Sequence, residues 1–457
     1  MSLLFTHAYY ISDDLREQKI MKPYPPLGLL YVSAYMKTKQ IENEVFDSTF
    51  SSLQSQLDFI QKMQPKVICI YTNLMTKIEV IKLMKILKSD LYRFPTLVLG
   101  GPDVTYNVEN YLKAGADFLV LGEGEVTTYE LYQALENKTN LHDVAGIAFV
   151  EKKEVIKTSE RTKLKELDEL PLPNRDAIDM QRYLDTWKTN HGQSSMTIST
   201  QRGCPYTCKW CSTAVYGQSY RRRPAHLVAQ EMKLLKDQYN PDAIWFVDDV
   251  FTVSHKWLIA FKEEVLAHDA LIPFECITRA ERLNEEILHL LKEIGCFRIW
   301  IGAESGSQKI IDLMDRRVEV NHVKNMIQKT NAMGIETGTF VMVGYPGEEE
   351  DDIKQTIDYL IAAKPTYYTI TIAYPIKGTS LYNEIENKIT NSLDWETTTD
   401  REIEFERTYA KKYYTYAVKW VVNEVEFSRL NNPYNWKGLK MKLKSIVARI
   451  LMKRIAI

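Results

Sequence analysis

The sequence lacks both a long apolar run and an excess of charge of one sign. No stretch of its 457 residues approaches the ~20 consecutive apolar residues of a membrane-spanning helix, and the amino terminus shows no basic leader or small-residue cleavage site. A net charge of -2 removes the usual electrostatic reason to expect a nucleic acid as a partner. We therefore expect a cytoplasmic protein that works on small molecules.

Cysteine is also scarce, but it is unevenly spread. Three of the six cysteines, Cys204, Cys208 and Cys211, fall within eight positions. In a reducing compartment such a cluster indicates metal ligation rather than a disulfide framework. The remaining three lie in apolar contexts that are typical of buried small hydrophobic residues: Cys69, Cys276 and Cys296.

The first third of the chain alternates short β-branched runs with amphipathic segments, which is typical of parallel strands joined by helices. It predicts an open, doubly wound, Rossmann-like α/β domain. The predicted strands cover residues 2–5, 44–46, 67–71, 97–99 and 118–121. Open parallel sheets bind ligands at the carboxyl ends of their strands, so the loops there form a candidate cofactor face. The alternative is that their glycines and prolines merely turn the chain.

A second series of strands follows a hairpin around residues 144–156 and a charged linker. Its predicted strands cover residues 196–200, 243–247, 274–277, 298–301, 337–343 and 367–372. Successive βα units indicate a partial or complete parallel β/α barrel with its active site at the carboxyl-terminal rim. The chain then divides into a Rossmann-like domain, a hairpin and linker, a barrel and a helical extension, over residues 1–140, 141–185, 186–390 and 391–457.

The three clustered cysteines occupy a loop that leaves the first barrel strand. Spacings of four and three residues let a short loop wrap one metal centre, and three thiolates on a four-iron cluster leave one iron open to a chelating small molecule. A structural zinc site, the alternative, normally closes with a fourth Cys or His. His191 and His226 lie outside the loop.

This loop resembles the CxxxCxxC signature of the radical S-adenosylmethionine superfamily, with an aromatic residue before the last cysteine. The resemblance implies a 4Fe-4S cluster held by Cys204, Cys208 and Cys211, whose fourth iron binds S-adenosylmethionine. Reduction of the bound molecule then yields methionine and a 5'-deoxyadenosyl radical. It also implies an external one-electron reductant such as flavodoxin or ferredoxin.

Further segments resemble motifs of that superfamily in the order expected for its barrel. Residues 245–252 resemble the segment that meets the methionine amino group, residues 301–306 a segment whose glutamate accepts hydrogen bonds, and residues 343–347 a glycine-proline motif that supports adenine. The resemblance makes these residues candidate S-adenosylmethionine contacts: Asp248, Asp249, Glu304, Gly344 and Pro346. Arg279, at a strand end, can pair with the cofactor carboxylate. Helix capping by the aspartates and a surface ion pair at Arg279 are the alternatives.

An open α/β domain before this barrel resembles the cobalamin-binding subgroup, which includes methyltransferases and ring-forming cyclases. The match rests on residues 25–31, 100–102 and 121–125. It implies cobalamin contacts at Gly28, Thr72, Gly100, Gly101, Gly122 and Glu123. In one departure, Thr49 and Ser52 replace the His and Gly of the DxHxxG pattern that begins at Asp47. Either cobalt has no protein ligand on its lower face, or the domain only shapes the substrate pocket.

The last segment is a basic helical stretch. An apolar stripe at helical spacing runs through Leu443, Ile446, Val447, Ile450 and Leu451, among seven Lys and Arg residues. Such a helix suits either an anionic membrane surface or docking against the barrel.

The leading hypothesis is an enzyme that methylates or rearranges an unactivated carbon of a small-molecule or lipid-like substrate. An iron-sulfur or metal-binding redox sensor without turnover and a zinc-stabilised scaffold are the alternatives. A methylthiotransferase is disfavoured because it requires additional amino-terminal cysteines, and only Cys69 precedes the central loop.

Overall fold

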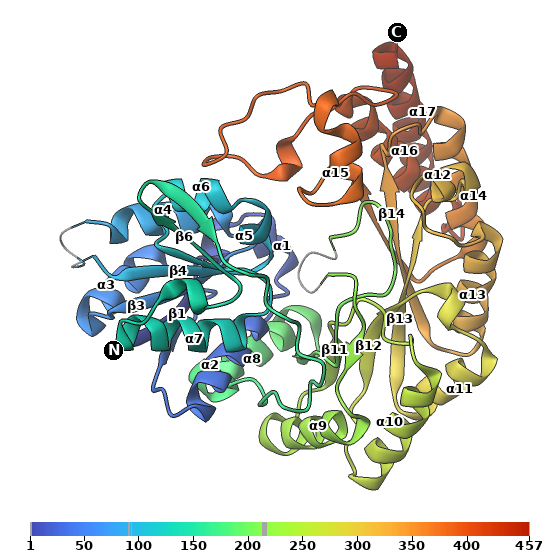
Figure 1. Ribbon diagram of the computed structural model, residues 1–457. Coiled ribbons are helices and arrows are strands. Elements are labelled where there is room, and N and C mark those ends of the chain that lie inside the picture. The colour runs from blue at the N-terminus through green and yellow to red at the C-terminus, as the bar shows by residue number, and fades with distance from the viewer. Residues whose placement is uncertain (1, 90–91, 93, 213–216, 457) are drawn as a thin grey trace.

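The computed structural model describes residues 2–89, 92, 94–212 and 217–456, and is built on two main sheets with helices around them (Figure 1). The first sheet has the strand order β2-β1-β3-β4-β5-β6-β7. Its first five members are parallel, and the last two add an antiparallel edge. The strands are β1 Leu3–His7, β2 Glu44–Phe46, β3 Val67–Tyr71, β4 Thr96–Gly100, β5 Phe118–Val120, β6 Ile147–Glu151 and β7 Glu154–Lys157.

Helices connect these strands and cover both faces of the sheet. Side chains alternate across the strands, so Leu4 packs into one apolar cluster while Leu3 and Phe5 pack into another on the opposite face. This confirms the predicted doubly wound domain. The helices are α1 Glu17–Ile20, α2 Leu27–Thr38, α3 Leu53–Met63, α4 Lys77–Leu87, α5 Pro102–Tyr106, α6 Val108–Lys113 and α7 Gly124–Asn137.

The second sheet has the order β15-β14-β13-β12-β11-β8, and all of its pairings are parallel. β8 and β15 stand at opposite edges, so the described strands form a partial barrel. They are β8 Ser195–Ile198, β11 Ala243–Phe246, β12 Phe274–Thr278, β13 Cys296–Glu304, β14 Glu336–Val343 and β15 Tyr367–Ile372. A short ribbon pairs β9 Gln201–Arg202 with β10 Arg221–Arg222.

Helices line the outer face of the partial barrel, and several begin at side-chain caps. Ser254 and Asn284 accept hydrogen bonds from the first turns of α10 and α11, and Glu349 with Asp352 forms a capping box at α14. The helices are α9 Ala225–Tyr239, α10 His255–Ala267, α11 Glu285–Glu293, α12 Gln308–Leu313, α13 Val320–Ala332 and α14 Glu350–Ala363.

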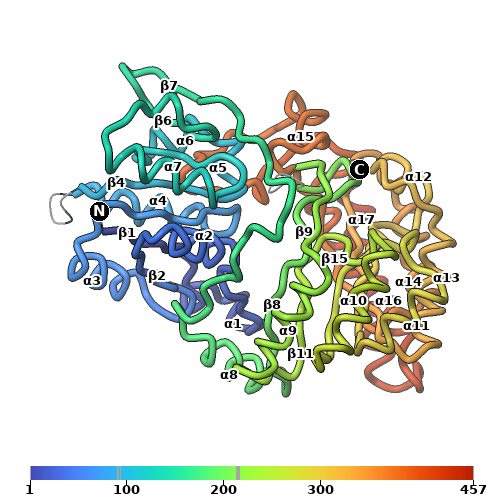
Figure 2. Tube along the Cα trace, turned by 60° about the horizontal axis from the view of Figure 1, so that its bottom comes forward, coloured from blue at the N-terminus to red at the C-terminus, as the bar shows by residue number. Residues whose placement is uncertain are grey.

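The segment between the sheets is packed rather than loose. The predicted hairpin is confirmed as β6 and β7, but it completes the first sheet. Residues 158–179 then cross to α8 Met180–His191 at the boundary between the two sheets (Figure 2). Trp187 of α8 donates to the Pro23 carbonyl oxygen at 2.8 Å, and Asn174 donates its backbone N–H to Leu30.

The carboxyl-terminal extension packs against the partial barrel and also contacts the first domain. It contains α15 Ser380–Ile385, α16 Lys411–Ser428 and α17 Trp436–Ala456, and its loop near Trp395 reaches back to the first sheet's helices (Figure 1). There Trp395 packs edge-on against Tyr111. The aromatic residues of α16 serve as core, with Tyr413, Tyr414 and Trp420 buried. Within the described residues, no helix is both long and apolar enough to cross a bilayer.

Candidate functional site

A cavity of about 420 Å³ lies between the carboxyl ends of the two sheets. Both halves of the chain contribute to its wall, so the strand ends that the sequence predicted as separate cofactor faces share one space. The first half contributes Gly28, Gly100, Gly101, Gly122 and Glu123, and the second half contributes Gln201, Arg202, Gly203, Ser212, Val247, Asp248 and Asp249.

Glycines expose bare backbone on the first sheet's side of the cavity. Gly101 has φ +118°, and a Cβ there would lie 2.2 Å from the carbonyl oxygen of Thr72. Only glycine fits this turn. At Gly122, with φ +82°, a Cβ would meet nothing within 4 Å. A flat ligand can therefore approach the backbone closely.

Thr72 does not reach this face, contrary to expectation. It is fully buried and is not among the residues that line the cavity. Its backbone N–H donates to Gly100 at 2.7 Å, and its carbonyl backs onto Gly101. Thr72 thus shapes the glycine turn from behind.

Two ion pairs tie the halves together beside the cavity. Glu123 pairs with Arg221 at 2.6 Å, and Glu125 pairs with Arg202. All four side chains are at least 89% buried. Glu123 lines the cavity, but its carboxylate is engaged by Arg221 rather than free for a ligand. Sequence analysis missed both arginines; the only local signal is that Arg202 lies two residues before the cysteine loop.

Backbone contacts hold the cysteine loop at its start and in its middle. Gly203, with φ +79°, passes so close to Ser219 that a Cβ would lie 2.3 Å from its carbonyl oxygen. Further along, the backbone N–H of Lys209 donates to Met314, and its carbonyl accepts from Leu381 at 2.9 Å. These contacts hold the loop over the carboxyl end of the sheet.

The three thiols of the loop are free cysteines and lie within electrostatic range of one another. Cys204 is buried, and Cys208 and Cys211 are half-buried. Burial and neighbouring negative charge, including that of Asp249, raise the pKa of Cys211 to about 12. Among the described residues, no three His, Cys, Asp or Glu side chains converge on a site for a single metal ion. Ser212, next to Cys211, lines the cavity, which therefore reaches this loop.

Arg279 is buried directly against the cysteine loop. Its Nη1 donates to Cys208 Sγ at 3.3 Å, and its Nε donates to Glu281 at 2.9 Å. Its guanidinium lies 3.9 Å from the centre of the Tyr206 ring, which belongs to the same loop. Arg279 is thus fixed by Glu281 and Tyr206, and it is not the surface ion pair that sequence analysis weighed.

The two neighbouring aspartates differ in their surroundings. Asp248 is buried and accepts the backbone N–H groups of Thr200 at 2.7 Å and Gln201 at 3.2 Å. Its carboxylate therefore fixes the start of the cysteine loop rather than capping a helix. Asp249 opens onto the cavity, and burial together with the charge of Asp248 raises its pKa to about 6. Asp248 also lines the cavity, but its carboxylate is engaged by the start of the cysteine loop.

Glu304 ends β13 in a left-handed conformation with φ +64°, beside a register irregularity in the sheet. Burial raises its pKa to about 7, and the nearby guanidinium groups of Arg316 and Arg279 oppose that rise. Glu304 lies close enough to the cysteine loop for its charge to raise the pKa of Cys211.

Gly344 and Pro346 follow β14 on the same rim, outside the lining of the described cavity. Gly344 has φ +79°, and its N–H donates to the buried Glu348. Arg407, from the extension, donates to the carbonyl oxygens of Gly344 at 3.3 Å and Ala373 at 3.1 Å. The turn is thus held in place by the carboxyl-terminal extension.

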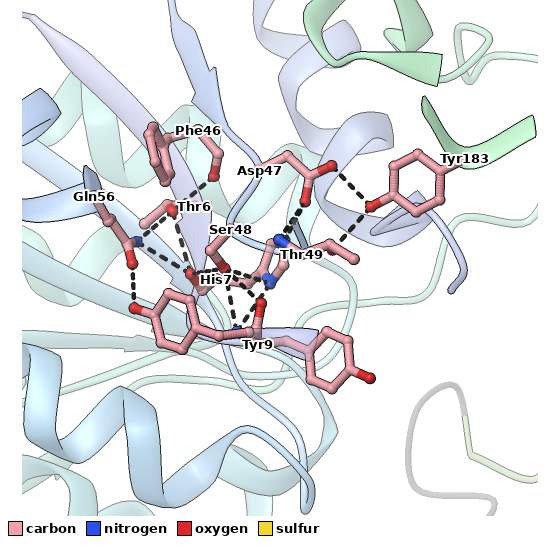
Figure 3. A network of polar contacts seen from close by, with 10 residues as sticks. Thr6, His7, Tyr9, Phe46, Asp47, Ser48, Thr49, Gln56 and Tyr183 are labelled. Carbon is pink, nitrogen blue, oxygen red and sulfur yellow. Dashed lines mark hydrogen bonds and ion pairs between the residues drawn. The ribbon is translucent and has the colours of Figure 1, made fainter. Parts of the chain in front are cut away.

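The Asp47 loop is closed by a polar network, shown in Figure 3. Asp47 accepts from His7 at 2.9 Å and from the Tyr183 hydroxyl at 2.8 Å, and Thr49 Oγ1 lies 2.8 Å from the same hydroxyl. Burial favours a raised pKa for Asp47, but the hydrogen bond and charge of His7 outweigh it and lower the pKa. The other ring nitrogen of His7 contacts Ser48. The loop thus joins α8 to the first sheet, and none of these side chains lines the cavity.

The residues present fit the cofactors that the motifs imply. Three free thiols stand on an anchored loop beside a fixed arginine, and bare glycine backbone faces them across one shared cavity. These features define an iron-sulfur enzyme with two α/β domains. A Rossmann-like domain that suits a cofactor faces a partial β/α barrel that carries the cysteine loop.

Comparison with known proteins leads to the same class. The model of the radical SAM superfamily matches residues 198–360, and that of the B12 binding domain matches residues 18–132. The chain is similar to the uncharacterized methyltransferase PH0819 of Pyrococcus horikoshii, at 27% identity over 81% of each chain. It is also similar to the anaerobic magnesium-protoporphyrin IX monomethyl ester cyclase of Rubrivivax gelatinosus, at 24% identity over 85% of this chain and 71% of the cyclase.

Two solved structures share the whole architecture. The cobalamin-dependent radical enzyme OxsB, with aqua-cobalamin and S-adenosylmethionine bound, superposes with a TM-score of 0.77 over 99% of this chain and 72% of OxsB, at 16% identity. The methyltransferase TsrM of Kitasatospora setae superposes with a TM-score of 0.69 over 86% of this chain and 79% of TsrM, also at 16% identity. The chain therefore combines a B12 binding domain at residues 18–132 with a radical SAM domain at residues 198–360. Its cofactors are a 4Fe-4S cluster, S-adenosylmethionine and cobalamin.

Proposed function

We propose that this enzyme methylates or rearranges an unactivated carbon of a small-molecule or lipid-like substrate. The observation that carries the proposal is the cavity between the two sheets, because the glycine face of the first half and the cysteine loop of the second both border it. When bound, the cluster, S-adenosylmethionine and cobalamin supply a 5'-deoxyadenosyl radical and a transferable methyl group.

We assign the cluster to Cys204, Cys208 and Cys211. Arg279 donates a hydrogen bond to one of these sulfurs and carries a positive charge, so it stabilises the negative charge that a thiolate ligand bears. Tyr206 stacks on its guanidinium and Glu281 fixes its far edge, which together prevent it from rotating away.

For S-adenosylmethionine we assign Asp249 and Glu304 as carboxyl contacts and the Gly344 to Pro346 turn as the adenine support. Asp249 and Glu304 have raised pKa values of about 6 and about 7 and lie near the cysteines, so each can accept or share a proton near neutral pH. Asp248 acts indirectly, through the backbone of Thr200 and Gln201.

For cobalamin we assign the backbone around Gly28, Gly100, Gly101 and Gly122. Since both ring nitrogens of His7 are engaged and Thr49 is turned toward Tyr183, the Asp47 loop offers no imidazole to cobalt. The chain's contribution on this side is shape: glycine turns leave room for a flat macrocycle, and the buried Glu125–Arg202 pair forms part of the cavity wall.

We also propose the partners and organisation expected from the sequence. An external one-electron donor such as flavodoxin or ferredoxin serves the cluster, and the enzyme is cytoplasmic with peripheral membrane contact through its basic last helix. The division at residues 140, 185 and 390 is proposed on the same basis. The two sheets support it, although the hairpin belongs with the first unit by its pairing to β5.

The test is anaerobic reconstitution of the full chain with iron and sulfide, with and without cobalamin, followed by chemical reduction in the presence of S-adenosylmethionine. We expect 5'-deoxyadenosine and a cobalamin absorbance that persists through gel filtration. A redox sensor, the second function considered, takes up the cluster but yields no deoxyadenosine. That outcome would overturn the proposal in favour of the sensor.

A further inference from the structure

The last helix, α17, is docked through one face only. Ser445, Ala448 and Met452 are buried at its contact with α16. Two ion pairs fix its rotation: Lys442 with Glu424 at 2.8 Å and Arg449 with Glu350 at 2.7 Å. The sequence left docking and a membrane as alternatives, but a helix held in this way has its opposite face available.

That opposite face is apolar. We define the outer stripe as Leu439, Leu443, Ile446, Val447 and Ile450, whose exposed fractions range from 46% to 63%. Their spacing places them on one side of the helix. Scattered exposed apolar residues are ordinary, but a continuous row on one helix is not. Leu451, expected in this row, is half-buried and does not belong to it.

Aromatic and basic side chains border the outer stripe. Trp436 and Tyr434, at the start of the helix, are 84% and 88% exposed. Trp and Tyr with one apolar and one polar end suit the interface between lipid and water. By helical spacing, Lys440 and Lys444 lie along one edge of the stripe, and Lys442, Arg449 and Lys453 lie along the other. From Trp436 to the last residue the sequence has no Asp or Glu.

We propose that the outer stripe of α17 lies in the surface of an anionic lipid bilayer. The apolar row enters the boundary of the acyl chains, while Lys440, Lys444 and Lys453 beside it meet lipid phosphates. Charge argues against a second copy of this chain as the occupant, because pairing two such helices would bring their basic edges together. The bilayer supplies both the apolar and the anionic complement.

The catalytic meaning of this contact rests on the proposed function. An enzyme held at a membrane meets lipid-like substrates at high local concentration, which fits the lipid branch of that proposal. The docking itself depends only on α17 and can be measured without turnover.

The experiment is flotation of the reconstituted full-length enzyme with vesicles of phosphatidylcholine, with or without 30 mole per cent phosphatidylglycerol, a fraction chosen to resemble an anionic leaflet at about physiological surface potential. We expect binding to the anionic vesicles to exceed binding to the neutral ones by at least tenfold and to fall in high salt. Leu443→Glu with Ile450→Glu should abolish flotation, and Lys440→Glu with Lys444→Glu should reduce it at least tenfold.

The matched control is Leu234→Glu with Leu266→Glu, two apolar residues of α9 and α10 with exposed fractions of 43% and 54%. It should float like the parent enzyme. Deoxyadenosine formation in vesicle-free solution should be the same for every variant as for the parent enzyme. If the parent enzyme floats but forms no deoxyadenosine, only the proposed function fails. Equal flotation with neutral vesicles, no flotation at all, or a dimer that the Leu443→Glu and Ile450→Glu changes dissolve would overturn the membrane proposal.

Discussion

Arg279 directs its Nη1 at the Sγ of Cys208, 3.3 Å away. The rest of its guanidinium is held by Glu281 and stacked on Tyr206, so the contact is imposed by the surrounding structure. An arginine fixed against one of three clustered thiols places a permanent positive charge beside a proposed ligand of the cluster. Hydrogen bonds to sulfur and local charge are among the factors that set the reduction potential of an iron-sulfur cluster.

Removing this charge should make the cluster harder to reduce. We expect Arg279→Met to lower the midpoint potential, because the reduced cluster loses a stabilising cation and an N–H donor. Arg279→Lys should fall between Met and the parent, since it keeps the charge but loses the planar fork. The measurement is a redox titration followed by electron paramagnetic resonance. An unchanged midpoint in Arg279→Met would show that the contact has no influence on the cluster.

Asp248 is predicted to stabilise the fold and to act on chemistry only through the loop. Asp248→Ala leaves the N–H groups of Thr200 and Gln201 without their acceptor, which should lower the free energy of unfolding by about 2–3 kcal/mol. Asp249→Ala, next in sequence but open to the cavity, should change stability little and weaken S-adenosylmethionine binding instead. Urea unfolding and equilibrium dialysis separate the two effects. Equal loss of stability in both variants would contradict this division of roles.

Glu348 gives a pH dependence of stability whose sign is fixed by burial. The folded protein raises the pKa of this fully buried carboxyl from 4.5 to about 8, so folding favours its protonated form. The contribution of this protonation to the free energy of unfolding is fully present below pH 4.5. It is lost as the pH rises through about 8. Glu348→Gln should therefore be more stable than the parent at pH 8.5 and lose this advantage near pH 5. Chemical unfolding at both pH values checks it, and a pH-independent difference would count against the prediction.

The two glycine turns at the cavity should respond differently to alanine. Gly101→Ala places a Cβ 2.2 Å from the Thr72 carbonyl oxygen and also holds an alanine at φ +118°. Gly122→Ala holds an alanine at φ +82°, but its Cβ meets only open space. We expect Gly122→Ala to cost about 1–2 kcal/mol from backbone strain alone and Gly101→Ala to cost clearly more. Thermal unfolding of the two variants gives the comparison. A smaller loss at Gly101 than at Gly122 would show that the turn relaxes.

Much of this arrangement could be predicted because it depends on local sequence. Alternating apolar runs determine where strands form, and parallel strands necessarily bring their carboxyl ends together. Glycines such as Gly101 mark turns that no other residue fits. The three clustered thiols, at a spacing that suits one metal centre, were found in the same way.

Other features depend on partners that are far apart in the chain, and local patterns do not contain them. The sequence could not show that backbone far away in the chain engages Thr72 and Asp248. Arg221 pairs with Glu123 across the two halves, and the local sequence around Arg221, three consecutive arginines, does not indicate this partner. Similarly, the apolar stripe of α17 could be read from its spacing, but which face α16 would cover could not.

The most direct measurement of the central claim is 5'-deoxyadenosine formation by Cys208→Ala beside Cys296→Ala, each with its bound iron determined. Cys296 is buried in the barrel core, so its replacement tests the loss of a sulfur atom away from the loop. The account predicts that Cys296→Ala keeps the iron and the product, while Cys208→Ala remains folded, binds less iron and forms no deoxyadenosine. Undiminished product from Cys208→Ala would contradict it.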